Sequence, residues 1–303
     1  MRYSHIIASS GLLAMVAGHG LVTSVQGANG VTMPGLSVAD GTPRDCSSNG
    51  CGSQADTSII RDRELGTNKA SALGRTEGNG PVDASAMIAN FMNGTGAPTN
   101  KGAASSSGIE DDLSALKGAT QNKRGVFGDL LSGLTGGGGD NKGTKSEQAV
   151  EDSVAASAGQ GASSGLPTCS DDGSITMTFR QINQDGAGPL KADVDGTSGG
   201  TDTDAFETAE VTQDVPGLPI GGLSLATNTD FPVTVQMPAG MTCDASVGGV
   251  DNVCIVRVRN GAIAGPFGGS AAFTQSTAAR KRAVAYRLKK RAEEDKHQNR
   301  RLR

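Results

Sequence analysis

His19 is the residue with the clearest potential for chemistry, because it directly follows a segment typical of a secretory signal peptide. Residues 1–18 begin with Arg2, continue through a short apolar run and end in Ala17 and Gly18, which is the order that signal peptidase reads. Cleavage after Gly18 makes His19 the N-terminal residue. Its amine and ring nitrogen then offer copper(II) part of the nitrogen-rich tetragonal site that this ion favours. The alternatives are an ordinary N-terminus without metal, and cleavage further along the chain.

Other catalytic constellations are poorly supported by the residue inventory. The chain has three histidines, and His5 lies in the predicted signal peptide while His297 lies in a basic tail. His19 is therefore the one histidine of the body, which argues against a Ser-His-Asp or Cys-His nucleophilic site. Paired carboxylates lie in Gly-rich turns and are expected to solvate loops rather than to act as acid and base: Asp171 with Asp172, and Asp193 with Asp195.

Five cysteines are disulfide candidates in a secretory context: Cys46, Cys51, Cys169, Cys243 and Cys254. Cys243 and Cys254 flank a Gly-Gly turn and could close a local hairpin-like loop. Cys46 and Cys51 are five positions apart around a turn. Because five is an odd number, at least one thiol is unpaired or pairs between chains. A zinc site is the weaker interpretation, since C-x4-C lacks a second closely spaced pair.

Two further kinds of modification site can be predicted from short motifs. Asn93-Gly94-Thr95 is the one glycosylation sequon of the chain. The pairs Lys281-Arg282 and Lys290-Arg291 are dibasic and are candidates for cleavage by a late-secretory protease. The alternative is that these basic pairs belong to a solvated charged tail.

Composition divides the chain into five segments. Residues 1–18 are the predicted signal peptide, 19–92 and 167–275 form two parts of one β-rich domain, 93–166 form a low-complexity disordered insertion, and 276–303 form a basic helical tail. The insertion is assigned because Gly, Ala, Ser, Thr and Asn dominate it, and such residues bury too little apolar surface to offset chain entropy.

Alternating apolar residues and Gly/Pro/Asp turns predict strands in both parts of the β-rich domain. We expect a mainly β fold, an antiparallel immunoglobulin-like sandwich. Its predicted strands are 21–26, 174–183, 206–215, 231–237, 252–259 and 271–275, and its predicted helices are 57–64 and 83–92.

Charge is segregated between the body and the tail. Residues 19–279 contain 15 basic and 28 acidic residues, a net charge of −13, whereas residues 280–303 contain 11 basic and 3 acidic residues, a net charge of +8. An acidic body disfavours nucleic acid as its partner. No apolar run reaches the ~20 residues of a membrane-spanning helix, so no membrane span is predicted.

Six stretches together resemble the Egh-type, or Gas-like, secreted proteins of filamentous fungi, which are described as appressorium-specific and penetration-associated virulence factors. The resemblance covers 19–92 and 167–275 and implies secretion, an association with infection structures or the fungal surface, and no established activity. The stretches are 19–27 (HGLVTSVQG), 41–45 (GTPRD), 180–189 (RQINQDGAGP), 229–232 (TDFP), 252–254 (NVC) and 264–269 (AGPFGG).

The resemblance also tests the copper hypothesis for His19. Lytic polysaccharide monooxygenases are secreted β-sandwiches in which an N-terminal histidine and a second histidine form a copper brace. Family members with a His-Gln-Val-Asn-x-Asp-Gly-Ala-Gly-Pro pattern offer such a second histidine, but Arg180 stands at that position here. A guanidinium stays protonated and has no free lone pair for a metal. Phe267 matches the place of an axial aromatic residue, or else it is a core residue.

We therefore expect a secreted protein, extracellular or attached to the cell wall, that acts by binding cell-wall polysaccharide or a host surface and needs no cofactor. The alternative is a copper-dependent monooxygenase-like enzyme, or a degenerate copy of one that retains glycan binding. A structural cell-wall protein retained through its basic tail is a third hypothesis.

Overall fold

The computed structural model describes residues 19–47, 51–96, 98–100, 142–218, 222–262 and 265–301. The predicted signal peptide, residues 1–18, lies outside this part of the chain. The described strands are β1 (Gly20–Gln26), β2 (Thr32–Pro34), β3 (Ser58–Ile59), β4 (Arg75–Thr76), β5 (Gly80–Pro81), β6 (Thr144–Lys145), β7 (Ser174–Gln181), β8 (Lys191–Asp195), β9 (Phe206–Gln213), β10 (Thr229–Gln236), β11 (Ala245–Val247), β12 (Val250–Arg259) and β13 (Phe267–Thr274). The helices are α1 (Ala84–Asn93), α4 (Ser153–Ala156), α5 (Gly161–Ser164), the 3₁₀ helix η4 (Thr203–Ala205) and α6 (Thr277–Arg301).

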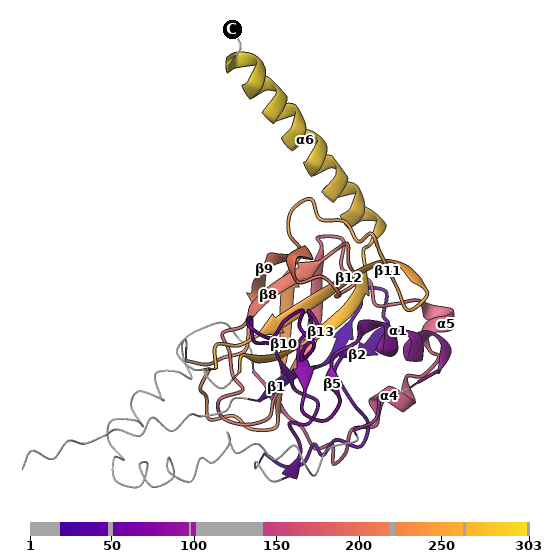
Figure 1. The fold of residues 1–303 in the computed structure, drawn as a ribbon, viewed down its shortest axis with the longest axis vertical. Helices are drawn as coiled ribbons and strands as arrows, with labels where there is room; N and C mark the ends of the chain where they lie inside the picture. The colour runs from indigo at the N-terminus through magenta and orange to yellow at the C-terminus, as the bar shows by residue number, and fades with distance from the viewer. Residues whose placement is uncertain are drawn as a thin grey trace, which may run out of the picture.

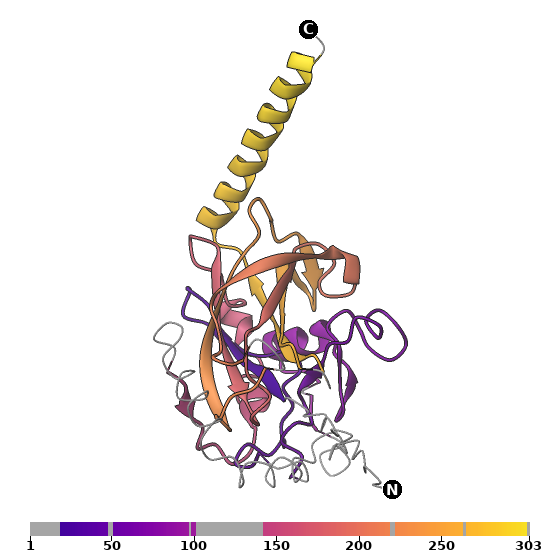
Figure 2. The same cartoon turned by 90° about the vertical axis from the view of Figure 1, so that its left-hand side faces the viewer.

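The strands form a curled antiparallel sheet with the outline of a half-barrel (Figures 1 and 2). Hydrogen-bonded neighbours follow the order β2-β1-β7-β10-β9-β8-β12-β13-β3-β4-β5. The sheet curls until β1 packs against β13, where a Cβ on Gly269 would lie only 2.6 Å from the Val22 nitrogen. The predicted antiparallel β class is confirmed. The strand path through one curled sheet does not reproduce the two separate sheets of the immunoglobulin-like prediction.

Alternation along the central strands explains why these segments form the sheet. On β7 the buried apolar residues are Ile175, Met177 and Phe179, and a partly exposed threonine separates each from the next. Their register partners on β10, Val235, Val233 and Phe231, are buried as well. Side chains two positions apart point to the same face of a strand, so both strands contribute one apolar row to the core.

Two helix predictions have opposite outcomes. Helix α1 begins after Asp83, whose side chain accepts a 2.8 Å hydrogen bond from the Ser85 nitrogen, and it ends at Gly94, which is left-handed with φ 70°. These caps satisfy backbone groups at both ends of the helix. The prediction of a helix at 57–64 is wrong, because Ser58 and Ile59 pair with β13 and with β4.

The five cysteines form two disulfides, Cys46–Cys51 and Cys243–Cys254, and leave Cys169 as a buried free thiol. Both bridges are local pairings that the spacing allowed. Burial raises the pKa of the Cys169 thiol, which makes it a poor nucleophile.

The segment predicted as a disordered insertion, 93–166, differs from that prediction over its last part. Residues 142–166 pack on the body, with β6 paired to β10 and with Val154 and Leu166 buried. Residues 101–141 lie outside the described part of the chain. The composition of residues 142–166 is poor in apolar residues, so polar contacts must supply much of their attachment.

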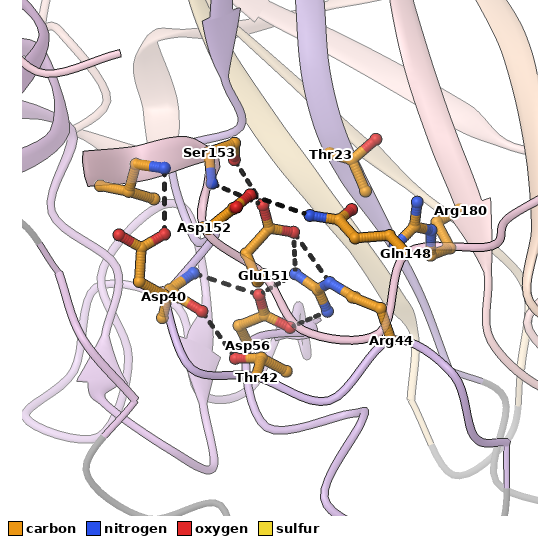
Figure 3. A network of polar contacts seen from close by, with 12 residues as sticks. Thr23, Asp40, Thr42, Arg44, Asp56, Gln148, Glu151, Asp152, Ser153 and Arg180 are labelled. Atoms are coloured by element: carbon orange, nitrogen blue, oxygen red, sulfur yellow. Dashed lines mark hydrogen bonds and ion pairs between the residues drawn. The ribbon is translucent and has the colours of Figure 1, made fainter. Parts of the chain in front are cut away.

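Those polar contacts converge on residues 39–44, which we call the neck segment (Figure 3). We call residues 93–166 the excursion. Near its start, the Asp40 nitrogen donates a hydrogen bond to the Pro98 oxygen at 3.2 Å. At the other end the Gly41 nitrogen donates to the Glu151 oxygen, and the Glu151 nitrogen donates to the Thr42 oxygen, both at 2.9 Å. The neck segment therefore holds both ends of the excursion side by side.

A buried ion triad is centred on Arg44, the last residue of the neck segment (Figure 3). Arg44 is 1% exposed; its Nε donates to Glu151 Oε2 at 2.8 Å, and its Nη1 donates to Asp56 Oδ1 at 2.9 Å. Burial alone would lower the pKa of Arg44, but Asp56 and Glu151 together raise it. The triad thus carries a fully charged arginine with a carboxylate partner from each side, Asp56 from the body and Glu151 from the attached segment.

The basic tail predicted for 276–303 forms helix α6, which projects from the body as a single straight element in both views (Figures 1 and 2). Its first turns are attached, because Arg280 Nη1 donates to the Cys243 oxygen at 2.9 Å and Ala279 and Ala283 are buried. No described helix has the length and apolarity needed to span a membrane.

Removal of one carboxylate from the triad should cost stability. We expect Glu151→Ala to lower the free energy of unfolding by about 3 kcal/mol, because it leaves the Arg44 charge buried with one partner fewer. Urea denaturation of the full chain measures the change. Glu147→Gln is the matched control, since Glu147 is exposed in the same segment. Equal stability of E151A and E147Q would show that the triad does not hold the segment.

The same carboxylate should make stability depend on pH. Burial raises the pKa of Glu151, but the Arg44 charge and the hydrogen bonds from Ser153 and Arg44 outweigh burial and hold that pKa below its usual value. A carboxyl group with a lowered folded pKa stabilises the fold above its unfolded pKa of about 4.3, and this contribution is lost as the pH falls through the folded pKa. The stability difference between the wild type and Glu151→Gln should therefore be constant near neutrality and shrink below about pH 4.3. Urea titrations across this range measure it; a difference that grows on acidification contradicts the assignment.

Candidate functional site

His19 lies immediately before β1, at one end of the half-barrel, and its side chain is buried. It is 4% exposed, and its ring packs on Phe267 with a centroid separation of 4.4 Å and an interplanar angle of 35°. The His19 nitrogen donates to Asn183 Oδ1 at 2.8 Å, and Asn183 Nδ2 lies 3.3 Å from His19 Nδ1. The backbone and the ring of His19 are therefore both fixed by the loop that follows β7.

That loop needs glycine where it passes His19. A Cβ on Gly186 would lie 1.9 Å from the His19 carbonyl oxygen, so no larger residue fits. The Ile182 nitrogen donates to the same oxygen at 2.9 Å. The loop also reaches the segment before β13, because Asn260 Nδ2 donates to the Asp185 oxygen at 3.1 Å and Asn260 Oδ1 accepts from the Phe267 nitrogen at 3.0 Å. The stretches HGLVTSVQG, RQINQDGAGP and AGPFGG thus meet at one end of the sheet.

Arg180 is held in an ion pair on the same strands. It stands opposite Leu21 on β1 and opposite Asp230 on β10. Its Nε donates to Asp230 Oδ1 at 2.7 Å and its Nη2 donates to Asp230 Oδ2 at 2.9 Å, a bidentate pair with Arg180 5% exposed. The TDFP stretch supplies this partner. Asp230 lies in a motif noted from the sequence, but its pairing with Arg180 could not be predicted, because Asp230 and Arg180 meet only across the folded sheet.

The surroundings of His19 do not fit a two-histidine copper brace. The position expected to supply the second ring nitrogen holds a guanidinium, and that guanidinium is already paired with Asp230. The polar groups that contact His19 in the described structure include the Asn183 amide, which is a weak ligand for copper(II). Among the described residues, no group of three or more His, Cys, Asp or Glu side chains is placed to hold a metal ion. Phe267, considered as an axial aromatic residue, is fully buried beside Ile59 and Ala262.

The remaining predicted site residues lie on other elements. Asn93 is the exposed last residue of α1, so the sequon is sterically accessible. Lys281, Arg282, Lys290 and Arg291 are exposed on α6. The first pair lies one turn before Arg287, which bonds to the body, and the second pair lies beyond that anchor.

Replacement of Arg180 tests whether its ion pair with Asp230 stabilises the fold. Arg180→His would restore the histidine of the related pattern, but an imidazole cannot form the bidentate pair with Asp230. We expect R180H to lose about 2 kcal/mol of stability, typical of hydrogen bonds between charged groups. Urea denaturation measures the loss, and calorimetric titration with copper(II) measures any gain of a site. Unchanged stability together with tight copper binding by R180H would contradict a structural role for the pair.

Comparison with known proteins supports the family resemblance that these motifs indicate. The family model described as Egh16-like virulence factor matches residues 17–268. The appressoria-specific virulence factor GAS2 of Pyricularia oryzae is 56% identical over 292 residues, which cover 96% of this chain and 95% of that protein. The appressoria-specific virulence factor GAS1 of the same organism is 37% identical over 129 residues, 41% of this chain and 50% of that protein. No solved structure matches significantly. The chain therefore belongs to the Egh16-like virulence factor family.

Proposed function

We propose that this chain is a secreted, virulence-associated protein that acts outside the fungal cell by binding polysaccharide of the cell wall or host surface, and that it is not an enzyme. The observation that carries this proposal is the Arg180–Asp230 pair. It occupies the place where copper-dependent polysaccharide cleavage would need a second histidine. The names of the relatives support the association with infection structures.

Two features support action outside the cell. Residues 1–18 have the composition of a signal peptide. The two disulfides are typical of proteins that fold in an oxidising compartment.

The second candidate function is a copper-dependent monooxygenase-like enzyme or a degenerate copy of one. The specific observation in its favour is His19 itself, which signal cleavage would place at the N-terminus. A degenerate copy of such an enzyme, which lacks the second copper ligand and retains glycan binding, gives the same expectation for metal content as our proposal.

The experiment that tests the proposal combines intact-mass analysis, metal analysis and a binding assay on the protein recovered from culture medium. We expect a mature chain that begins at His19, copper far below one ion per chain, and retention on at least one of insoluble chitin, cellulose or β-1,3-glucan. One tightly bound copper per chain, with oxidised oligosaccharides released in the presence of a reductant, would establish the enzyme instead. Absence of retention on every polysaccharide would overturn the binding proposal.

A further inference from the structure

A cavity of about 300 Å³ lies where helix α6 leaves the body. Its walls are the loop after β10, the turn before β7 and one face of the first turns of α6, contributed by residues that include Met241, Asp172, Arg282 and Tyr286. This volume is at the lower end of the range for small-molecule sites in proteins. None of the residues around His19 lines this cavity. Two lining residues belong to motifs noted from the sequence: Asp172 to a pair of carboxylates, and Arg282 to a dibasic pair.

The cavity is held open by a fixed frame. Arg287 Nε donates to the Gly240 oxygen at 2.5 Å, and Arg287 Nη2 donates to Thr242 Oγ1 at 2.5 Å. Arg280 Nη1 binds the Cys243 oxygen, and Cys243 is tied to β12 through its disulfide with Cys254. The helix cannot swing away without breaking several of these contacts, so a ligand would meet a preformed site at a small cost in ordering.

Tyr286 gives this cavity an aromatic wall. Its side chain is 48% exposed, while one edge of the ring lies so close to Gly240 that a Cβ there would approach Cδ1 to 2.9 Å. One edge of the ring thus lies against the Gly240 backbone, while the exposed part of the ring presents apolar surface to a ligand. An aromatic ring with one apolar face and one polar tip suits a partner that carries both kinds of surface.

Opposite charges lie beside this ring. The Asp172 carboxylate accepts hydrogen bonds from the Ser174 nitrogen at 2.9 Å and from the hydroxyls of Ser174 and Ser170. These bonds, with the one from Ser170 the largest contribution, lower the pKa of Asp172 to about 2. Arg282 offers five N–H donors on the same cavity. The two charges cancel, and together they provide an acceptor and a set of donors.

We infer that this cavity binds a neutral oligosaccharide, with one pyranose ring stacked on Tyr286 and its hydroxyls bonded to Asp172 and Arg282. Hydroxyl groups both donate and accept, which matches a carboxylate beside a guanidinium. The inference rests on the proposed function and locates its binding site.

The test uses the scarcity of aromatic residues in this chain. Tyr3 and Tyr286 are its two tyrosines and it has no tryptophan. Because Tyr3 lies in the predicted signal peptide, Tyr286 is the one tyrosine of a mature chain that begins at His19. We expect chitohexaose, cellohexaose or laminarihexaose to change the tyrosine emission of this mature chain and to bind it in calorimetry. Tyr286→Ala should weaken binding roughly tenfold, Tyr286→Phe should change it by less than about threefold, and Asp172→Asn should weaken it several-fold.

Two matched controls keep the interpretation specific. Leu288→Ala alters an exposed residue of α6 that does not line the cavity, and it should leave affinity unchanged. The double variant Lys289→Gln/Lys290→Gln lowers the helix charge and should also have no effect on neutral sugars. Circular dichroism confirms that each variant is folded.

The possible failures are distinguishable. If the full chain is retained on insoluble polysaccharide but Y286A and D172N bind as well as the wild type, or no hexasaccharide binds, the cavity assignment is overturned and the proposed function stands. If the full chain binds neither hexasaccharides nor insoluble polysaccharides, the proposed function itself fails.

Discussion

The buried guanidinium of Arg44 is the constraint on which the rest of this architecture depends. A charge that is almost fully removed from water must be neutralised at short range, and Asp56 and Glu151 do so from two distant parts of the chain. Glu151 belongs to residues 142–166, the last part of the excursion. Its ion pair with Arg44 therefore both neutralises the buried guanidinium and attaches this segment to the body. The curled sheet can therefore tolerate a large low-complexity excursion, since the neck segment receives both of its ends at one place.

A second buried arginine, Arg180, links two neighbouring strands of the sheet. It lies on β7 and forms two parallel hydrogen bonds with Asp230 on β10. Bidentate pairing of this kind is specific to a guanidinium and cannot be copied by an imidazole. Three of the stretches that resemble the Egh-type proteins thus contribute residues to buried ion pairs: GTPRD contributes Arg44, RQINQDGAGP contributes Arg180 and TDFP contributes Asp230. These motif residues therefore stabilise the folded body, and a ligand would have to bind at another surface.

The junction of α6 with the body is such a surface. The residues that fix the helix, Arg280 and Arg287, differ from those that line the cavity beside it, Tyr286 and Arg282. Substitutions of the lining residues therefore need not detach the helix, so the binding proposal can be tested without unfolding the junction.

The sequence by itself determined the features that depend on near neighbours. Alternation predicted β7 and β10, the Cys243–Cys254 and Cys46–Cys51 spacings allowed the observed bridges, and the charged composition after residue 276 predicted the helix. In contrast, Glu151 lies 107 positions from its partner Arg44, and Asp230 lies 50 positions from its partner Arg180. A single sequence does not show which residues at such separations meet. Segment 142–166 was assigned to disorder because its composition is poor in apolar residues, yet a buried ion triad and backbone hydrogen bonds attach it. Only the tertiary structure could decide these points, because the energy of a buried charge depends on which groups surround it in space.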